Sequence, residues 1–209
     1  MGQTPLWALP YPELSEPADV PADIRELAQA LDPLLASKPP LVSSLPASPT
    51  DGQEVYYLAD SVDGTVWHLR YRAASASAYK WEMIGGGPLS KYVASSQVVA
   101  STSFLDLTAG PTMTIPLAGR YMVQLAASGS NTAATGQGQY TVRYGGVDDG
   151  NLNTTLTSAA ANQAVNGVGL PILCTFTAAQ VLTSRGRTFT AGTATLIARR
   201  ITAMPIRVA

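Results

Sequence analysis

Hydrophobic and polar positions alternate with a period of two over much of this chain after residue 53. Three consecutive runs, EVYYLAD, TVWHLRY and YKWEMIG, show this alternation and are rich in aromatic and β-branched residues, as is typical of strands. Asp63-Gly64 favours a hairpin turn between the first two runs, and the small residues RAASASA separate the second from the third. The pattern predicts a small three-stranded β-meander at residues 54–87.

One face of this predicted meander carries large apolar side chains. In the second run Trp67 and Leu69 alternate with His68 and Arg70, so His68 is expected on the opposite face. Because three strands are near the lower limit for independent stability, the apolar face needs a cover. We interpret it as a docking face for other chains, made of Tyr57, Trp67, Leu69, Tyr71 and Trp81.

The second half of the chain, residues 88–209, alternates in the same way. The expected strands are SFLDL, TMTI, GRYMVQLAAS, QYTVRYGG, LPILCTF, FTAGTATLIARR and ITAMPIRV. Many short strands joined by Gly, Asn and Ser predict a jelly-roll-like β-sandwich, with GGGPL at 85–89 as a hinge before it. The polar segment NLNTTLTSAAANQAVNG is expected to be a surface loop or a weak edge strand.

The N-terminal part has a different, helical pattern. A proline-rich opening favours an extended arm, and the apolar residues that follow recur with spacings of three, four and three. They predict a short helix with a narrow seam, which Pro33 ends or kinks; the seam consists of Ile24, Leu27, Leu31 and Leu34. It either joins three copies of the chain or packs within one copy. The expected domains are arm and helix at 1–35 and a Pro/Ser-rich linker at 36–53.

Composition and charge narrow the classes of function. The 209 residues are 46% hydrophobic and only 13% charged, which suits a globular β-rich protein. Through residue 63 there are ten acids against two bases, and afterwards four against eleven, so the two segments are expected to face different partners or each other. The bases are scattered, which argues against nucleic acid binding. No apolar run is long enough for membrane insertion, and the N-terminus lacks the pattern of a signal peptide.

The sequence offers few groups for chemistry. His68 lies within a strand and no G-x-S-x-G motif accompanies it, so we expect a structural imidazole. Asp148 and Asp149 are interpreted as turn formers, in preference to calcium ligands with Asn151. Cys174, in an apolar run, is expected to be buried and inert. We therefore predict no catalytic residue, no metal and no cofactor. The SRGRTF segment is interpreted as a hairpin tip that contacts a glycan or a neighbouring subunit.

Two resemblances add to this interpretation. Residues 10–90, with YPELSEPADVPADIRELAQALD and then GQEVYYLAD, VWHLRYR and YKWE, resemble the N-terminal part of minor tail and fibre-like structural proteins of tailed bacteriophages. The second half, through LAGRYMVQLAAS, FTAGTATLIARR and ITAMPIRVA, resembles the C1q/TNF-like jelly rolls that cap many trimeric fibres. In such jelly rolls three copies bury their flat faces around an axis. The absence of a secretion signal departs from the cytokine members.

Together the resemblances imply a non-enzymatic virion protein, made in the bacterial host cytoplasm and present on the particle surface. It would be a homotrimeric fibre, spike or minor tail protein, anchored by its N-terminus to other proteins of the head, neck or tail. It would display the sandwich for host attachment. Two alternatives remain: a carbohydrate-binding receptor-recognition module that binds a host surface glycan, and a polysaccharide depolymerase. Glycan binding by the C-terminal domain would mark the first, and product release from host polysaccharide the second.

Overall fold

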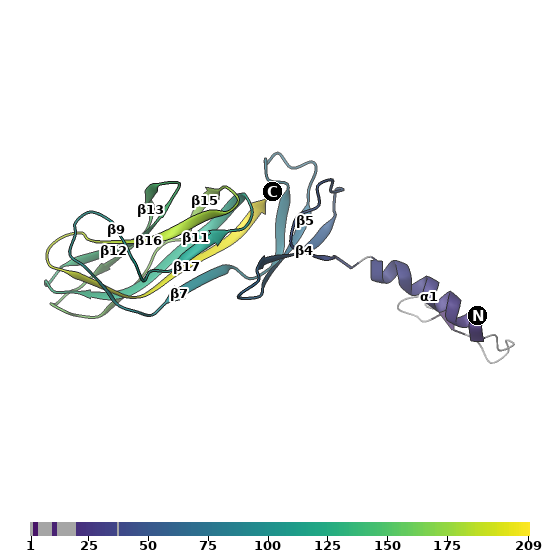
Figure 1. Ribbon diagram of the computed structural model, residues 1–209, viewed down its shortest axis with the longest axis horizontal. Coiled ribbons are helices and arrows are strands. Elements are labelled where there is room, and N and C mark those ends of the chain that lie inside the picture. Colours follow the sequence, from purple (N-terminus) through teal and green to yellow (C-terminus); the bar gives the residue numbers. More distant parts are fainter. Residues whose placement is uncertain (1, 4–9, 12–19, 37) are drawn as a thin grey trace. The chain divides into compact units, whose positions relative to one another are not determined.

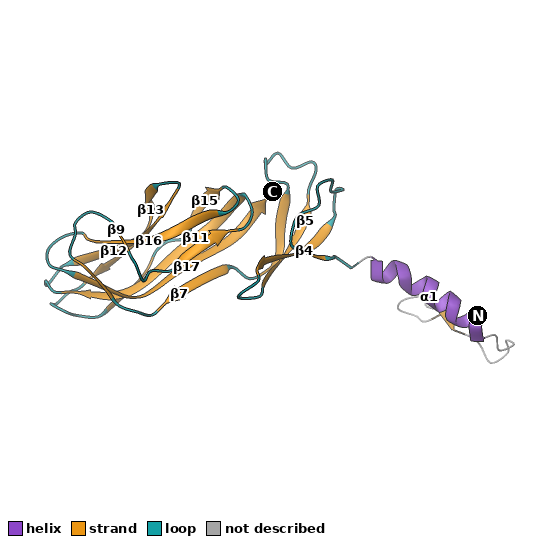
Figure 2. Cartoon of the chain, in the orientation of Figure 1, coloured by secondary structure: helices purple, strands orange, loops and turns teal. Residues whose placement is uncertain are grey.

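The computed structural model describes residues 2–3, 10–11, 20–36 and 38–209. The described chain is mainly β, with one helix (Figure 2). It divides into two compact units, residues 1–40 and 41–209. No helix in these described residues is long and apolar enough to cross a membrane.

The first unit contains the predicted helix. Strand β1 (Gly2–Gln3) pairs antiparallel with β2 (Pro10–Tyr11), and helix α1 spans Val20–Ala36. The rest of the predicted arm lies outside the described residues. Pro21 stands in the first turn, where its missing N–H costs nothing. The helix continues through Pro33, so the prediction that this proline could end it is wrong.

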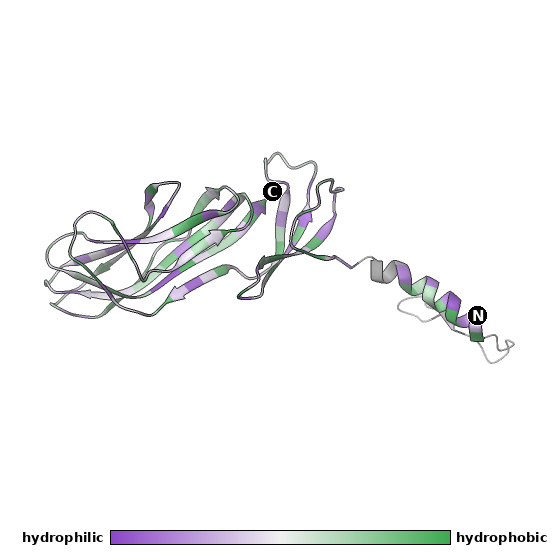
Figure 3. Cartoon of the chain, viewed as in Figure 1, coloured by the Kyte–Doolittle hydropathy of each residue, from purple (hydrophilic) through white to green (hydrophobic). Residues whose placement is uncertain are grey.

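The second unit, which the structure describes in full, contains strands β3 to β17. Their bounds are β3 Leu41–Val42, β4 Glu54–Asp60, β5 Thr65–Tyr71, β6 Trp81–Gly86, β7 Leu89–Val93, β8 Gln97–Val99, β9 Leu105–Asp106, β10 Thr112–Ile115, β11 Gly119–Asn131, β12 Gln137–Tyr144, β13 Val147–Thr157, β14 Val165–Val168, β15 Ile172–Phe176, β16 Gln180–Thr188 and β17 Ala194–Val208. Strands β4, β5 and β6 pair in sequence as the predicted antiparallel meander. Apolar and polar residues alternate along the strands, as Figure 3 shows.

Residues 89–208 form a sandwich of two layers (Figure 1). In one layer β17 lies between β11 and the pair β7 and β8, and β11 also pairs with β14 and β15. In the other, β16 lies between β12 and the pair β9 and β10, and β12 also pairs with β13. When β7 with β8, β9 with β10, and β14 with β15 are each counted as one strand, the sandwich has eight strands in chain order. The first, third, sixth and eighth of these share one layer. This double Greek key is the jelly roll that the sequence predicted.

The last strand, β17, joins the meander to the sandwich. One of its edges pairs with β11, and the other pairs in turn with β8, β7 and β6. Its final residues Arg207 and Val208 lie opposite Glu82 and Trp81 of β6. The meander therefore continues the sheet of the sandwich, and the segment at 85–90 is not a boundary between compact units.

Gly86 of that segment has a local structural reason to be glycine. Gly86 has a φ of +108° and lies opposite Trp67 in the ladder between β5 and β6. A Cβ atom at this position would collide with the carbonyl oxygen of Val66. Only glycine allows this backbone conformation and this close approach. Gly86 thus allows β5 and β6 to approach closely, and the segment is part of the sheet instead of a hinge.

One hydrophobic core runs through the meander and the sandwich. Trp67 stacks on Tyr57 with 6.0 Å between ring centroids and contacts Tyr121 of β11 at 6.1 Å, and Tyr121 contacts Phe176 at 5.7 Å. The indole nitrogen of Trp67 donates a hydrogen bond to the carbonyl oxygen of Gly87, at 2.9 Å. These aromatic contacts fasten the two parts together.

This core corrects the expectation of a docking face. Tyr57, Trp67, Leu69 and Trp81 are all buried, and Tyr71 is partly buried against the same core. The cover that the meander needs is supplied by the jelly roll of the same chain. The face is therefore not free to bind another protein.

The structure also corrects several segments. The last two predicted strands, 189–200 and 201–208, form the single long strand β17 from Ala194 onwards. The polar segment 151–167 contributes to β13 and to β14. Because β13 lies at the edge of its sheet, this confirms the predicted edge strand in preference to a surface loop. Strands β7, β8 and β16 were not predicted. SRGRTF is not a hairpin tip, because Ser184–Thr188 lies in β16 between two neighbouring strands.

The predicted linker is partly built into the second unit. Leu41 and Val42 form β3, which pairs parallel with β4, and Val42 and Leu45 pack against the core. Apolar residues within a Pro/Ser-rich segment explain this attachment, because they gain by leaving water. The compact units meet at residue 40, inside the predicted linker.

Candidate functional site

The outer surface of the layer around β11 and β17 carries a row of apolar side chains. Met122 of β11 lies between its register partners, Leu173 of β15 and Met204 of β17. They point out of the sandwich, since their neighbours Tyr121 and Ala203 are fully buried. Met122 is 37% exposed, Leu173 44% and Met204 45%. Such a row across three strands is a flat surface suited to contact with another protein.

The apolar surface continues on the shorter strands. Tyr92 of β7, Val98 of β8 and Val168 of β14 are each more than half exposed. Arg200 lies over the ring of Tyr92, 5.3 Å from its centroid, beside a shallow depression of about 250 Å³. We define the apolar face as Tyr92, Val98, Met122, Val168, Leu173, Ile197 and Met204.

The outer surface of the opposite layer is polar. Gln139 of β12 lies in register between Arg187 of β16 and Thr155 of β13. Arg143 and Arg185 project from the same layer and form ion pairs with acidic residues. We define the polar face as Gln139, Arg143, Thr155, Arg185 and Arg187. The two outer faces of the sandwich therefore differ in chemistry, which suits them to different partners.

Asp148 lies in β13 and is held by arginines. Its carboxylate forms ion pairs with Arg143 at 3.1 Å and with Arg185 at 3.0 Å. The turn before it is formed by Gly145 and Gly146, whose φ angles are +58° and +80°. The prediction that Asp148 forms the turn is therefore wrong, because the two glycines adopt the left-handed conformations required.

Asp149 has a local role. Its carboxylate accepts hydrogen bonds from the hydroxyl of Tyr144 at 2.6 Å and from the backbone amides of Asn151 and Leu152 at 2.8 and 3.0 Å. Burial raises the pKa of Asp149, but these donors outweigh it and hold the pKa below its ordinary value. The carboxylate closes a turn within β13, as short acidic side chains commonly do.

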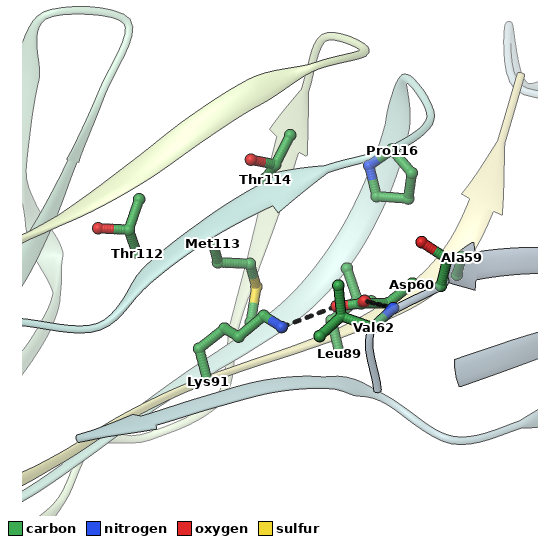
Figure 4. A pocket seen from close by; sticks show the side chains of 10 residues that line it. Ala59, Asp60, Val62, Leu89, Lys91, Thr112, Met113, Thr114 and Pro116 are labelled. Carbon is green, nitrogen blue, oxygen red and sulfur yellow. Dashed lines mark hydrogen bonds and ion pairs between the residues drawn. The ribbon is translucent and has the colours of Figure 1, made fainter. Parts of the chain in front are cut away.

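A cavity of about 330 Å³ lies where the β4–β5 turn meets β7 and β10 (Figure 4). Figure 4 shows Lys91 reaching Asp60 beside the buried Met113. The Lys91 ammonium contacts Asp60 at 2.8 Å and Asp63 at 2.6 Å. The hydrogen bond from Lys91 is the main reason that the pKa of Asp60 is lowered, and Asp60 is the main reason that the pKa of Lys91 is raised. The ion pairs fasten the meander turn to the sandwich.

These ion pairs predict a pH-dependent contribution to stability. Because the folded-state pKa of Asp60 is lowered, its contribution is complete above the ordinary value of 3.8 and is lost as pH falls below it. At neutral pH, Lys91→Met is expected to reduce the free energy of unfolding by about 1 kcal/mol, a value limited by solvent screening. At about pH 2, where protonation of Asp60 is favoured, the difference between the variant and the wild type should be smaller. Thermal unfolding followed by circular dichroism tests this.

The matched control for this prediction is Lys80→Met. Lys80 donates to the backbone carbonyl of Ser75 instead of to a carboxylate. The effect of Lys80→Met on the free energy of unfolding should therefore be the same at both pH values. A difference between wild type and Lys91→Met that is as large in acid as at neutral pH would show that the lysine acts through packing of its aliphatic stem.

On the other side of the meander, Glu82 and His68 have structural partners. One Glu82 oxygen accepts hydrogen bonds from Arg70 and Arg72, and the other accepts one from Arg207 of β17 at 3.3 Å. His68 lies on the face opposite Trp67, as predicted, and its Nε2 is 2.8 Å from Glu54. Glu82 thus links the meander to the last strand of the sandwich. The imidazole thus makes a side-chain contact between the paired strands β4 and β5.

The seam of helix α1 is open where the structure describes it. Ile24 is 62% exposed, Leu27 is 38% exposed and Leu31 is half-buried. The side chain of Leu34 lies outside the described residues. An amphipathic helix with an uncovered seam is suited to association with other helices.

The single cysteine is unreactive at neutral pH. Cys174 of β15 is buried, and burial is the main reason that its pKa rises to about 11. Its thiol is therefore protonated, which disfavours nucleophilic attack and metal binding. This confirms the prediction from its apolar sequence context.

Comparisons with known proteins bear on the fold alone. No protein-family model matches the chain, and no curated protein matches it significantly. Similar solved structures include the Eiger TNF of S. frugiperda, with 12% identity, a TM-score of 0.42 and coverage of 59% of this chain and 95% of that one. The PRD1 vertex protein P5 has 19% identity, a TM-score of 0.40 and coverage of 59% and 100%. Murine APRIL has 7% identity, a TM-score of 0.34 and coverage of 55% and 97%.

The apolar face was not found by sequence reasoning, although a signal was present. In the final strand Ile201 and Ala203 alternate with Thr202 and Met204, so apolar residues occur on both sides of the strand. In an antiparallel sheet the outer side of a strand commonly faces water and is polar, so an apolar residue such as Met204 on that side is a signal of an apolar outer surface.

Proposed function

We propose that the protein is a structural component of a tailed-phage virion that assembles as a homotrimer. Its N-terminal unit anchors it to other virion proteins, and its jelly roll is displayed for host attachment. The observation that carries the proposal is the apolar face, with Leu173, Met122 and Met204 in one row. The resemblance of residues 10–90 to minor tail and fibre-like proteins supports the virion setting.

Association of copies through the apolar face explains the contrast between the two outer surfaces. Removing apolar side chains from water stabilises an assembly. Burying the opposite face would instead remove charged groups from water, which is unfavourable. Three copies that turn their apolar faces toward a common axis expose their polar faces outward. The open seam of α1 supports the same arrangement, because three short helices in parallel can bury Ile24 and Leu27.

Two measurements test this function. Light scattering on the full-length protein should give three times the chain mass of 21.8 kDa. Labelled antibodies against the protein should decorate intact phage particles at the head, neck or tail. A monodisperse monomer at micromolar concentration would overturn the trimer, and absence from purified particles would overturn the virion role.

We further propose that the protein is not an enzyme. The acidic residues of segment 88–209 are Asp106, Asp148 and Asp149, and each is held by an arginine or by hydrogen-bond donors. A glycosidase requires one carboxyl group with a raised pKa that can donate a proton. Incubation with host polysaccharide is therefore expected to release no reducing ends. Turnover that disappears in Asp148→Asn would contradict this and favour a depolymerase.

A further inference from the structure

Arg187, on the polar face, is held in one orientation by its surroundings. The central carbon of its guanidinium lies 4.4 Å from the ring centroid of Phe104 and 4.6 Å from that of Phe189. Its Nε donates to the amide oxygen of Gln139 at 2.8 Å. The Gln139 nitrogen in turn donates to the hydroxyl of Thr155 at 3.2 Å. Both ends of the Gln139 amide are thus used, so the contacts of Arg187 are fixed before any ligand arrives.

The terminal nitrogens of Arg187 remain available. Within residues 38–209, Nη1 and Nη2 of this side chain have no hydrogen-bond or ion-pair partner. Arg185, two residues earlier, is by contrast nearly buried, paired with Asp106 at 2.5 Å and Asp148 at 3.0 Å, and bonded to the Phe104 carbonyl oxygen at 2.6 Å. The nearby carboxylates are therefore engaged by other arginines, while the aromatic and amide contacts hold the Arg187 fork in place.

We propose that Arg187 is the centre of a binding site for a carboxylated saccharide, with the sugar carboxylate bound by Nη1 and Nη2. A guanidinium edge and a carboxylate match in charge and in planar geometry, and both bonds are charge-assisted. Because the guanidinium is already ordered, little conformational entropy is lost on binding. The site goes beyond the assembly function and does not depend on the oligomeric state.

The neighbouring groups favour a sugar over other anions. The hydroxyl of Thr155 accepts a bond from Gln139 and keeps its own proton to donate to a sugar hydroxyl. Thr155 lies two strands from Arg187, about 10 Å away, so a ligand that reaches both is larger than an isolated carboxylate. The ring of Phe189 is 49% exposed and offers a surface for the apolar side of a sugar.

Binding of defined oligosaccharides to the full-length protein tests the site. The probes are oligogalacturonate and sialyllactose, each compared with its carboxyl methyl ester and with neutral lactose. At least one acidic probe should bind, and esterification should weaken it by at least about tenfold, as expected for loss of a charged hydrogen-bonding group. Arg187→Gln should have a similar effect. Arg187→Lys, which keeps the charge, should still lose affinity because it lacks the planar fork.

The matched control is Arg143→Lys, because Arg143 lies in the same layer but is already paired with Asp148. It should bind like the wild type. Unchanged thermal unfolding of Arg187→Lys would separate lost binding from lost structure. Equal affinity of the wild type and Arg187→Lys, equal binding of the methyl ester, or failure of both acidic probes would overturn the proposal. Equal binding of a glutamate-rich peptide would assign the fork to acidic peptides and also overturn it.

Discussion

Met122→Glu is expected to convert the proposed trimer into monomers at micromolar concentration. In the single chain Met122 is 37% exposed, so a glutamate there can remain hydrated and leave the fold intact. In a trimer built on the apolar face, the same carboxylate would lose its water next to Leu173 and Met204. An unpaired charge in such a place costs several kcal/mol, about a thousandfold or more in the association constant. Light scattering should then report 21.8 kDa instead of three times this mass.

Val181→Glu is the matched control for this experiment. Val181 lies in β16 of the opposite layer and is 44% exposed, so the change in size and charge occurs in a comparable strand environment. This variant should remain trimeric. If Val181→Glu dissociates and Met122→Glu does not, the chain assembles through its polar layer and the proposed orientation is reversed.

Trp67→Ala is expected to destabilise residues 41–209 as one unit, by about 4 kcal/mol, as for other large buried aromatic side chains. Trp67 is fully buried, contacts Tyr57 and Tyr121, and donates a hydrogen bond to Gly87. Truncation leaves a cavity where the meander meets the jelly roll. Urea unfolding in the Met122→Glu background keeps dissociation out of the measurement. Fluorescence and far-ultraviolet circular dichroism should shift to the same lower midpoint.

Tyr56→Ala is the corresponding control in the same meander. Tyr56 is 40% exposed and lies against His68, with 4.6 Å between ring centroids, on the side away from the core. Its loss should cost about 1 kcal/mol or less. Two separated transitions in Trp67→Ala, with the jelly-roll transition unchanged, would show that 54–87 is an independent module after all.

Local sequence patterns predicted much of the secondary structure. Strands β4 and β5 were predicted with their observed bounds, because alternation and the Asp63-Gly64 turn are properties of neighbouring residues. Strand β16 was missed since Arg185-Gly186-Arg187 interrupts its apolar pattern. In the structure a Cβ at Gly186 would collide with Leu196 of β17. The close packing of Leu196 and Leu107 against Gly186 becomes visible only when the two layers are brought together.

Contacts between residues far apart in the chain were less accessible to sequence reasoning. Tyr57 and Trp67 were recognised as one face, but the sequence did not show that the jelly roll of the same chain covers it. Arg187 was noticed only as part of a short basic motif. Its distinction from Arg185 depends on contacts with residues 37 to 83 positions away.

The sequence by itself determined the β-rich class, the seam of the N-terminal helix, the meander and the burial of Cys174. These follow from periodicity and from the polarity of neighbouring side chains, which act over a few residues. The tertiary structure decided that the meander and the jelly roll share one core, that one outer face is apolar and the other polar, and that Arg187 keeps a free edge. These properties depend on strand order and register, which bring together side chains that are far apart in the chain.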